Sequence, residues 1–346
     1  MKSTSLPKHW IKRSGAYYYR PPAKYKHLFD KQWVHLGRSL SEAYKKFADL
    51  PVHGEEGIYL IRDLADAYET KIVSKKAPLT QKSNQRSLRA IREVFGDIPV
   101  HKLEPRHCYQ YFEANGERVI ARRTIEVLRH MCTIAVQWGL LKRNPIKGEL
   151  RLKTPKPRQR YVTDGELLRF REMCNDKMKA YIDLKLATGL TKEDILCLDR
   201  RDIQEDGIHT HRRKTEAKPK IYEWDDEGLL KAIIEAVHKA HKKHVGSSRL
   251  FHTYQGKPYY HVNDEGHALS QPEGFNSMWQ RLMKKWVDSG GERFTEHDLR
   301  AKSASDTDLL HAQLLMDHTD KKVTEKYYRR KPKVVKPNFD PGKKDQ

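Results

Sequence analysis

The chain has 346 residues, with 68 lysines and arginines against 46 acidic residues and a formal net charge of +22. This length allows two or three domains with ordinary cores. So large a positive charge favours a polyanionic partner, nucleic acid first, over a surface that is merely rich in lysine. No run reaches the roughly 18 apolar residues of a membrane span, and the first residues lack the apolar core of a signal peptide. We therefore expect a cytoplasmic protein with no membrane partner.

The first segment, residues 1–54, is basic and reads as a small sheet followed by one helix. Residues 17–20 and 33–36 are rich in strand-favouring side chains, and prolines and a lysine-rich turn separate them. A helix is expected to begin near Ser41. The aromatic residues either form a small core or reach DNA, since strands can enter the major groove, and we expect alternating positions to divide between these roles. The candidate DNA contacts are Tyr18, Arg20, Trp33 and Arg38.

Residues 57–150 show the apolar spacing of a helical domain. Apolar side chains recur three and four residues apart, as helix cores require; they include Tyr59, Leu60, Leu64, Tyr68, Leu88, Ile91, Val94, Ile125, Leu128, Cys132 and Val136. Basic residues lie beside these stripes, one group on a helix expected to begin near Thr80 and another just before the last helix. Each is either a DNA contact or part of a solvated face. The candidate contacts are Lys82, Arg86, Arg89, Arg122 and Arg123.

Residues 151–160 hold five lysines and arginines, two prolines and no acidic residue. Such a segment cannot bury a core, so an extended linker is expected. If the flanking domains grip one duplex, this linker would follow phosphates and fix the register without reading bases. Its candidate contacts are Lys153 and Arg158. The next domain, residues 161–331, is expected to start with a helix at Asp164 and to be mainly helical with one small sheet, and a basic tail follows at 332–346.

The four cysteines, Cys108, Cys132, Cys174 and Cys197, are widely spaced and form no C-x-x-C pair. Each lies in an apolar or mixed helical pattern. Buried thiols are therefore expected, rather than disulfides or zinc ligands, and no metal site is predicted.

The last part of the chain carries side chains suited to phosphoryl transfer: His297, Arg300, His318 and Tyr327. Attack on a phosphodiester builds negative charge on its nonbridging oxygens, so cationic donors must surround it. His297 and Arg300 lie three residues apart and would share a helix face. A tyrosine hydroxyl can form a covalent ester with the DNA phosphate. This ester conserves the energy of the broken phosphodiester bond, so rejoining the strand needs no ATP. We expect no metal and no other cofactor.

These spacings resemble the tyrosine recombinase, or phage integrase, family. The matching pieces are His297-x-x-Arg300, then His318 with Tyr327 nine residues after it, and Lys214 between two strand-like segments. The resemblance implies that Lys214 is the general acid to the departing 5′ oxygen. It also implies a multidomain, mainly α fold with small β-sheets, as in lambda-like integrases. The parts would be an arm-type DNA-binding domain at 1–54, a helical core-binding domain at 57–150 and an α+β catalytic domain at 161–331.

One position departs from the family pattern. The segment from Ala187 to Leu196 resembles the one in which the first catalytic arginine follows Thr-Gly-Leu, and Thr191 stands in its place here. Asp194, the acidic residue three positions on, fixes the register. Loss of a guanidinium that clamps the phosphate is expected to cost about 100- to 1,000-fold in rate. Lys192 can replace it only in part, because an ammonium lacks the bidentate fork.

Two assignments keep alternatives. Tyr328 competes with Tyr327 as the nucleophile, or both only pack a helix, and the nine-residue distance from His318 favours Tyr327. Lys214 competes with neighbours that could be plain backbone contacts, and the Lys-Thr pair in the expected turn favours it. Those neighbours are Arg212, Arg213, Lys218 and Lys220.

The resemblance implies a site-specific recombinase of phage or prophage origin. It would cut and rejoin double-stranded DNA at attachment-type sites through a 3′-phosphotyrosyl intermediate, as a homotetramer on DNA in the bacterial cytoplasm and nucleoid. Accessory DNA-bending or directionality factors are compatible partners. Thr191 raises the alternative of a catalytically weak recombinase-like DNA-binding protein. A type IB-like topoisomerase is the third alternative, and the additional N-terminal module disfavours it, because such a module suits a protein that binds two kinds of site.

Overall fold

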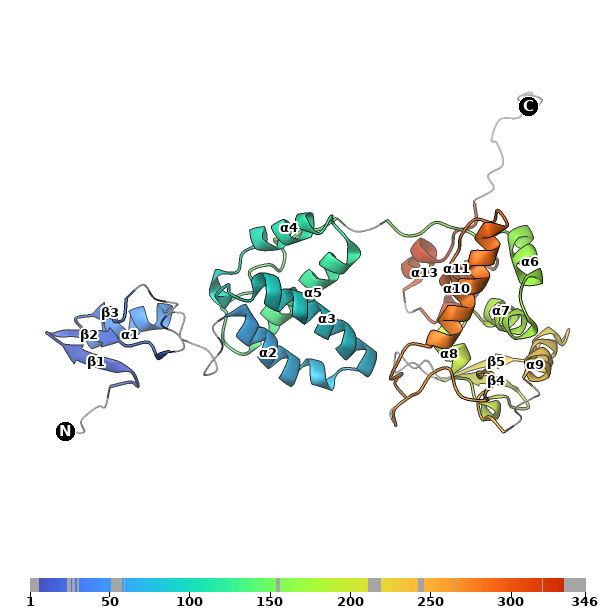
Figure 1. Cartoon of the computed structure of the whole chain (residues 1–346), viewed down its shortest axis with the longest axis horizontal. Helices are drawn as coiled ribbons and strands as arrows, with labels where there is room; N and C mark the ends of the chain where they lie inside the picture. Colours follow the sequence, from blue (N-terminus) through green and yellow to red (C-terminus); the bar gives the residue numbers. More distant parts are fainter. Residues whose placement is uncertain are drawn as a thin grey trace, which may run out of the picture. The chain divides into compact units, whose positions relative to one another are not determined.

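The computed structural model describes residues 6–23, 26, 29, 31–50, 58, 60–153, 156–210, 219–241, 246–264, 266–318 and 320–332. The chain divides into two compact units, residues 1–155 and 156–346 (Figure 1). The division falls inside the segment predicted as a basic linker. The finer division into arm-type, core-binding and catalytic domains remains a prediction.

The first element of the chain is a small antiparallel sheet with one helix. Its strands are β1 (Trp10–Arg13), β2 (Ala16–Tyr19) and β3 (Val34–Gly37), in that spatial order, and α1 (Leu40–Asp49) packs on β3. Trp10, Tyr19, Leu36 and Ala43 form the core. The expected sheet and helix are thus present, and β1 is an addition that the sequence analysis missed.

A helical bundle follows in the same unit. Its helices are α2 (Ile61–Lys71), α3 (Pro78–Phe95), α4 (Pro105–Ala114) and α5 (Val119–Gln137). Most residues of the apolar stripes form its core, although Leu60 and Val136 are only partly buried and Tyr59 lies outside the described residues. One prediction was wrong: Val94 is 50% exposed and Phe95 is buried instead. The reason is helical geometry, because Leu88, Ile91 and Phe95 are three and seven residues apart, on one face. A second correction is that α5 begins at Val119, so Arg122 and Arg123 lie within its first turns and do not precede it.

The second unit is mainly helical with one small sheet, as predicted. In chain order it holds α6 (Asp164–Glu172), α7 (Asp176–Thr188), α8 (Lys192–Leu196), β4 (Gly207–Thr210), β5 (Lys220–Glu223), α9 (Leu229–Ala240), α10 (Glu273–Asp288), α11 (Glu296–Ser305), α12 (Leu309–Met316) and α13 (Lys321–Tyr327). Strands β4 and β5 pair antiparallel. Helix α7 packs against both α9 and α11, and most of its residues from Met178 to Thr188 are buried. Its packing positions α11, which carries His297 and Arg300, two of the predicted site residues.

The mainly helical fold with small antiparallel sheets is confirmed. All four cysteines lie in the described part of the chain as buried thiols, and burial raises the pKa of Cys108, Cys132 and Cys174 to about 12. Across the described ranges, no helix has the length and apolar character needed to cross a membrane. In the same ranges, no three His, Cys, Asp or Glu side chains are grouped to hold a metal ion.

A buried histidine at the end of α9 makes the stability of the second unit pH-dependent. His241 is 2% exposed, and within the described chain neither ring nitrogen has a hydrogen-bond partner. Burial, followed by the nearby positive charge of Lys177, lowers the pKa of His241 to about 3. The unfolded chain takes up this proton near pH 6.5, so the stabilisation is complete above that pH and declines as pH falls toward 3.

We expect acidification from pH 7.5 to 5 to lower the free energy of unfolding by about 2 kcal/mol through His241 alone. Denaturant unfolding at the two pH values measures the loss. His241→Leu should reduce this pH dependence by the same amount. An unchanged dependence in that variant would show that other groups are responsible.

Candidate active site

Helix α11 presents the two residues of the His-x-x-Arg motif. Thr295 caps it: the backbone N–H and hydroxyl of Thr295 both donate to Asp298 Oδ2, at 2.7 and 2.8 Å. This capping box fixes where the helix begins. His297 and Arg300 consequently lie one turn apart on the same face, as the sequence predicted.

Arg300 is the buried centre of the site, with 3% of its surface exposed. Its guanidinium donates to the carbonyl of Gly189, and its Nη2 donates to the carbonyl of Met316 at 3.0 Å. Gly189 ends α7 with a φ of 63°, which favours glycine, and a Cβ there would lie 2.5 Å from Met316 Cε. Arg300 therefore ties the end of α7 to the end of α12.

His297 lies at the surface at the start of α11 and remains a base at neutral pH. The surrounding protein lowers the pKa of His297, mainly because the imidazolium would lose solvation there. The charge of Glu296 acts in the opposite direction, and the positive charges of Lys185 and Arg300 lower the pKa further. Its Nε2 lies 3.2 Å from the hydroxyl of Tyr328. A neutral imidazole can accept a proton from such a hydroxyl.

His318 closes the other side of the same group. Its Nδ1 lies 2.9 Å from the Thr324 hydroxyl, which fixes the ring against α13. The ring centroid of His318 is 5.0 Å from that of Tyr328, and His297 is 5.4 Å from it. The Arg300 guanidinium lies 5.7 Å from the same ring. Three predicted site residues thus surround one aromatic ring.

That ring belongs to Tyr328 and not to Tyr327, on which the spacing of the motif falls. Tyr327, the last residue of α13, is 40% exposed, and Lys326 Nζ lies 5.3 Å from its ring. Tyr328 is the C-cap residue of the same helix. The structure therefore brings together His297, Arg300 and His318 around Tyr328, with Tyr327 beside them at the surface.

Thr191, the residue predicted to stand in place of a catalytic arginine, has a structural role. It is the N-cap of α8: its hydroxyl donates to Asp194 Oδ2 at 2.5 Å, and the Asp194 N–H donates back at 3.2 Å. Two lysines lie close by. Lys185, 1% exposed, donates to the carbonyl of Leu190 at 3.0 Å and is ion-paired with Glu296. Lys192 Nζ lies 2.7 Å from Asn276 Oδ1 on α10.

A cavity of about 240 Å³ opens beside these residues. Its lining residues are basic, polar, acidic and aromatic: Lys192, Arg293, His297, Asn276, Gln280, Thr295, Glu296, Phe275, Trp279 and Phe294. A concave site with apolar walls and a few polar groups is of the kind that holds a ligand. Sequence reasoning did not find this cavity, or the Lys185–Glu296 pair, because the residues involved lie far apart in the chain.

Lys214 lies outside the described residues, as do its competitors Arg212, Arg213 and Lys218. The fourth competitor, Lys220, begins β5. Its ammonium donates to the carbonyls of Leu314 and Leu315, the latter at 3.3 Å. The sheet formed by β4 and β5 is thereby attached to the end of α12, two residues before His318.

Several of the candidate DNA contacts interact with other side chains of the protein. Some are held by other parts of the protein: Arg158 Nε lies 2.9 Å from Asp298, Lys153 Nζ 3.0 Å from Glu117, and Arg122 Nε 3.1 Å from Glu126. The guanidinium of Arg20 lies 5.3 Å from the Trp33 ring, and Tyr18 packs edge-on against His35. The exposed candidates are Arg20, Arg38, Lys82, Arg86, Arg89 and Arg123, and Lys153 and Arg158 are exposed as well in spite of their ion pairs.

Comparison with solved structures identifies the fold. A lambda integrase tetramer bound to a Holliday junction matches with a TM-score of 0.64 and 18% identity, over 96% of this chain and 98% of that one. A shorter lambda integrase dimer bound to a COC′ core site matches with a TM-score of 0.66 and 17% identity, over 81% of this chain and 100% of that one. The Tn1549 transposon integrase in complex with circular intermediate DNA matches with a TM-score of 0.57 and 16% identity, over 78% of this chain and 95% of that one.

The chain therefore has the fold of the lambda integrase type of tyrosine recombinase over nearly its whole length. The resemblance drawn from the motifs is confirmed at the level of fold. No protein-family model matches the sequence, and no curated protein matches it either.

Proposed function

We propose that this protein is a site-specific DNA recombinase of the phage integrase type. The observation that carries the proposal is the convergence of His297, Arg300 and His318 on Tyr328, the residue next to Tyr327 at the end of α13. His297 and Arg300 come from α11 and His318 from the connection between α12 and α13, and a merely structural role would not require two histidines and an arginine at one place. The net charge of +22 supports a polyanionic substrate.

In the proposed reaction, Tyr327 attacks a phosphodiester of one strand. A bond forms between the tyrosine oxygen and phosphorus, the bond to the 5′ oxygen breaks, and a 3′-phosphotyrosyl link and a 5′ hydroxyl result. His297, Arg300 and His318 hold the charge that develops on the phosphate. Attack by the 5′ hydroxyl of a partner strand reverses the step and releases Tyr327, so no external energy source is required.

In the described structure, the side chains are not yet arranged for this reaction. Arg300 donates to two carbonyls, and the Tyr328 hydroxyl lies against His297, where a phosphate oxygen would have to bind. Tyr327 faces solvent. Under the proposal, DNA binding turns the end of α13 so that Tyr327 reaches the phosphate, and Tyr328 leaves the group. Exchange between two duplexes takes four subunits, because each subunit supplies one nucleophile.

The test starts from DNA that the protein itself selects from a random duplex library. A selected duplex with a nick near the cleavage point traps the covalent intermediate, because the short fragment diffuses away after attack. A protein–DNA adduct that survives denaturation supports the proposal. Tight binding with no adduct at any nick position favours the second candidate, a DNA-binding relative of low activity, which the capping role of Thr191 supports.

The general-acid role proposed for Lys214 gives a separate expected result. Lys214→Ala should slow cleavage of an ordinary nicked duplex by about 100-fold or more, within the usual range for general acid catalysis. A substrate with a 5′-phosphorothiolate at the cleaved bond has a leaving group that needs no proton, so it should restore the rate of the variant. Lys220→Ala is the matched control and should show no selective rescue. Failure of the thiolate to rescue Lys214→Ala rejects the role.

A further inference from the structure

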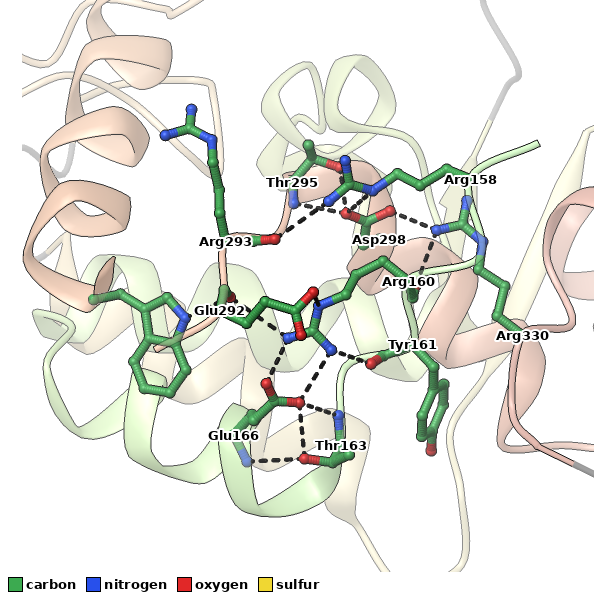
Figure 2. Close-up of polar contacts among 11 residues, drawn as sticks. Arg158, Arg160, Tyr161, Thr163, Glu166, Glu292, Arg293, Thr295, Asp298 and Arg330 are labelled. Carbon is green, nitrogen blue, oxygen red and sulfur yellow. Dashed lines mark hydrogen bonds and ion pairs between the residues drawn. The ribbon is translucent and has the colours of Figure 1, made fainter. Parts of the chain in front are cut away.

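Asp298, between the two residues of the His-x-x-Arg motif, is a buried carboxylate that serves two arginines at once. It is 1% exposed. Its Oδ2 caps α11 through Thr295 and lies 2.9 Å from Arg158 Nε, while its Oδ1 lies 2.5 Å from Arg330 Nη1 (Figure 2). The carboxylate therefore connects the start of α11 to two segments that are far from it in sequence.

Arg330 is fixed by more than this ion pair. Its side chain is 6% exposed. Its Nε donates to the carbonyl of Tyr327 at 3.0 Å, and its Nη1 also donates to the carbonyl of Arg160 at 3.2 Å. The backbone N–H of Arg330 donates to the Ser305 hydroxyl at 2.8 Å, and that hydroxyl donates to the carbonyl of Tyr328 at 2.8 Å.

These contacts hold the backbone of both tyrosines to α11. Asp298 and Ser305 lie at the start and at the end of this helix, which also carries His297 and Arg300. A buried guanidinium with a carboxylate and two carbonyls around it is strongly oriented, because any rotation leaves a buried charge without a partner. The place of the nucleophile relative to the phosphate-binding residues is thereby set through one arginine.

We propose that Arg330 is a positioning residue for the nucleophile and that Asp298 holds it in place. The proposal rests on the function proposed above. Arg330 does not touch the reacting atoms; it acts through the carbonyl of Tyr327. Arg158 shares the same carboxylate, so the segment that enters the second unit contributes to the same anchor (Figure 2).

The experiment compares the rate of adduct formation with DNA affinity on the nicked duplex. Arg330→Met keeps the aliphatic stem and should slow single-turnover adduct formation by about 10- to 100-fold, as small misplacements of reacting groups do. The Kd for the duplex should change less than about threefold, since one phosphate contact at most is lost. Arg329→Met is the matched control: Arg329 is exposed, the charge change is identical, and the rate should remain near wild type.

Two further variants make the result specific. Asp298→Asn should slow the reaction similarly. Combining it with Arg330→Met should add little, because both changes break the same ion pair between Asp298 and Arg330. Arg330→Lys should restore part of the rate, since an ammonium can pair with Asp298 but cannot reach all three acceptors. These two variants also carry the test if Arg330→Met fails to fold, which circular dichroism would show.

Wild-type rates in both Arg330→Met and Asp298→Asn would overturn the positioning role. A parallel loss in Arg329→Met would also overturn it, because the effect would then be one of charge. Absence of any adduct with the wild-type protein is a different result: it overturns the proposed function, and the positioning role with it.

Discussion

Tyr327→Phe is expected to abolish the covalent protein–DNA adduct, with a loss of at least about 1,000-fold, because the phenolic oxygen is the proposed nucleophile. Tyr328→Phe should leave adduct formation within about tenfold of wild type. It removes only the hydroxyl that lies 3.2 Å from His297 and keeps the ring between the two histidines. Both variants change one oxygen atom, so each is the control for the other. Gel mobility of the trapped complex under denaturing conditions is the measurement.

The opposite pattern has a clear structural meaning. If Tyr328→Phe loses the adduct and Tyr327→Phe keeps it, the described arrangement is the reactive one, with the hydroxyl already against His297. Tyr328 would then be the nucleophile, and the nine-residue spacing from His318 would have misled the assignment. If both variants form the adduct, the tyrosine pair is not the nucleophile at all.

Thr191→Arg is expected to increase the rate of strand cleavage by about 100- to 1,000-fold, because a guanidinium at that place adds a charged donor for the phosphate. The substitution also removes the N-cap of α8, at a cost of about 1 kcal/mol of stability. Single-turnover cleavage of the nicked duplex measures the gain, and thermal unfolding measures the cost.

Two controls separate charge from capping. Thr191→Ala removes the cap and adds no charge, so its rate should not rise. Thr191→Lys adds a point charge without the bidentate fork and should give a smaller gain than arginine. No gain with arginine in a folded protein would indicate that another cation already fills the role, with Lys185 and Lys192 the nearest candidates.

The sequence predicted features that depend on regular spacing or on neighbouring residues, such as helix faces and turns. The His-x-x-Arg spacing placed two side chains on one helix face, and α11 has them there, because a three-residue separation is nearly one helical turn. The strand β1 was missed, although Ser14 and Gly15, at φ of 49° and 76°, form the tight connection that a Ser-Gly pair favours. Val94 was wrongly predicted as buried because the three-residue spacing from Leu88 to Ile91 was repeated once more. A helix has about 3.6 residues per turn, so the next buried position is Phe95.

What the sequence could not give is contact between distant segments. Nothing in the order of residues shows that Lys185 pairs with Glu296, or that Arg158 and Arg330 meet at Asp298. Each pair depends on how α7, α11 and the chain ends pack. The choice between two adjacent tyrosines is equally beyond sequence, because it turns on which face of the end of α13 points inward.

The most direct test of the central claim is to digest the trapped adduct and identify the modified peptide by mass spectrometry. The account predicts a nucleotide attached to the peptide that contains residues 321–329, on the phenolic oxygen of Tyr327. Modification of a residue outside that segment, or cleaved DNA with no attached peptide, would contradict it.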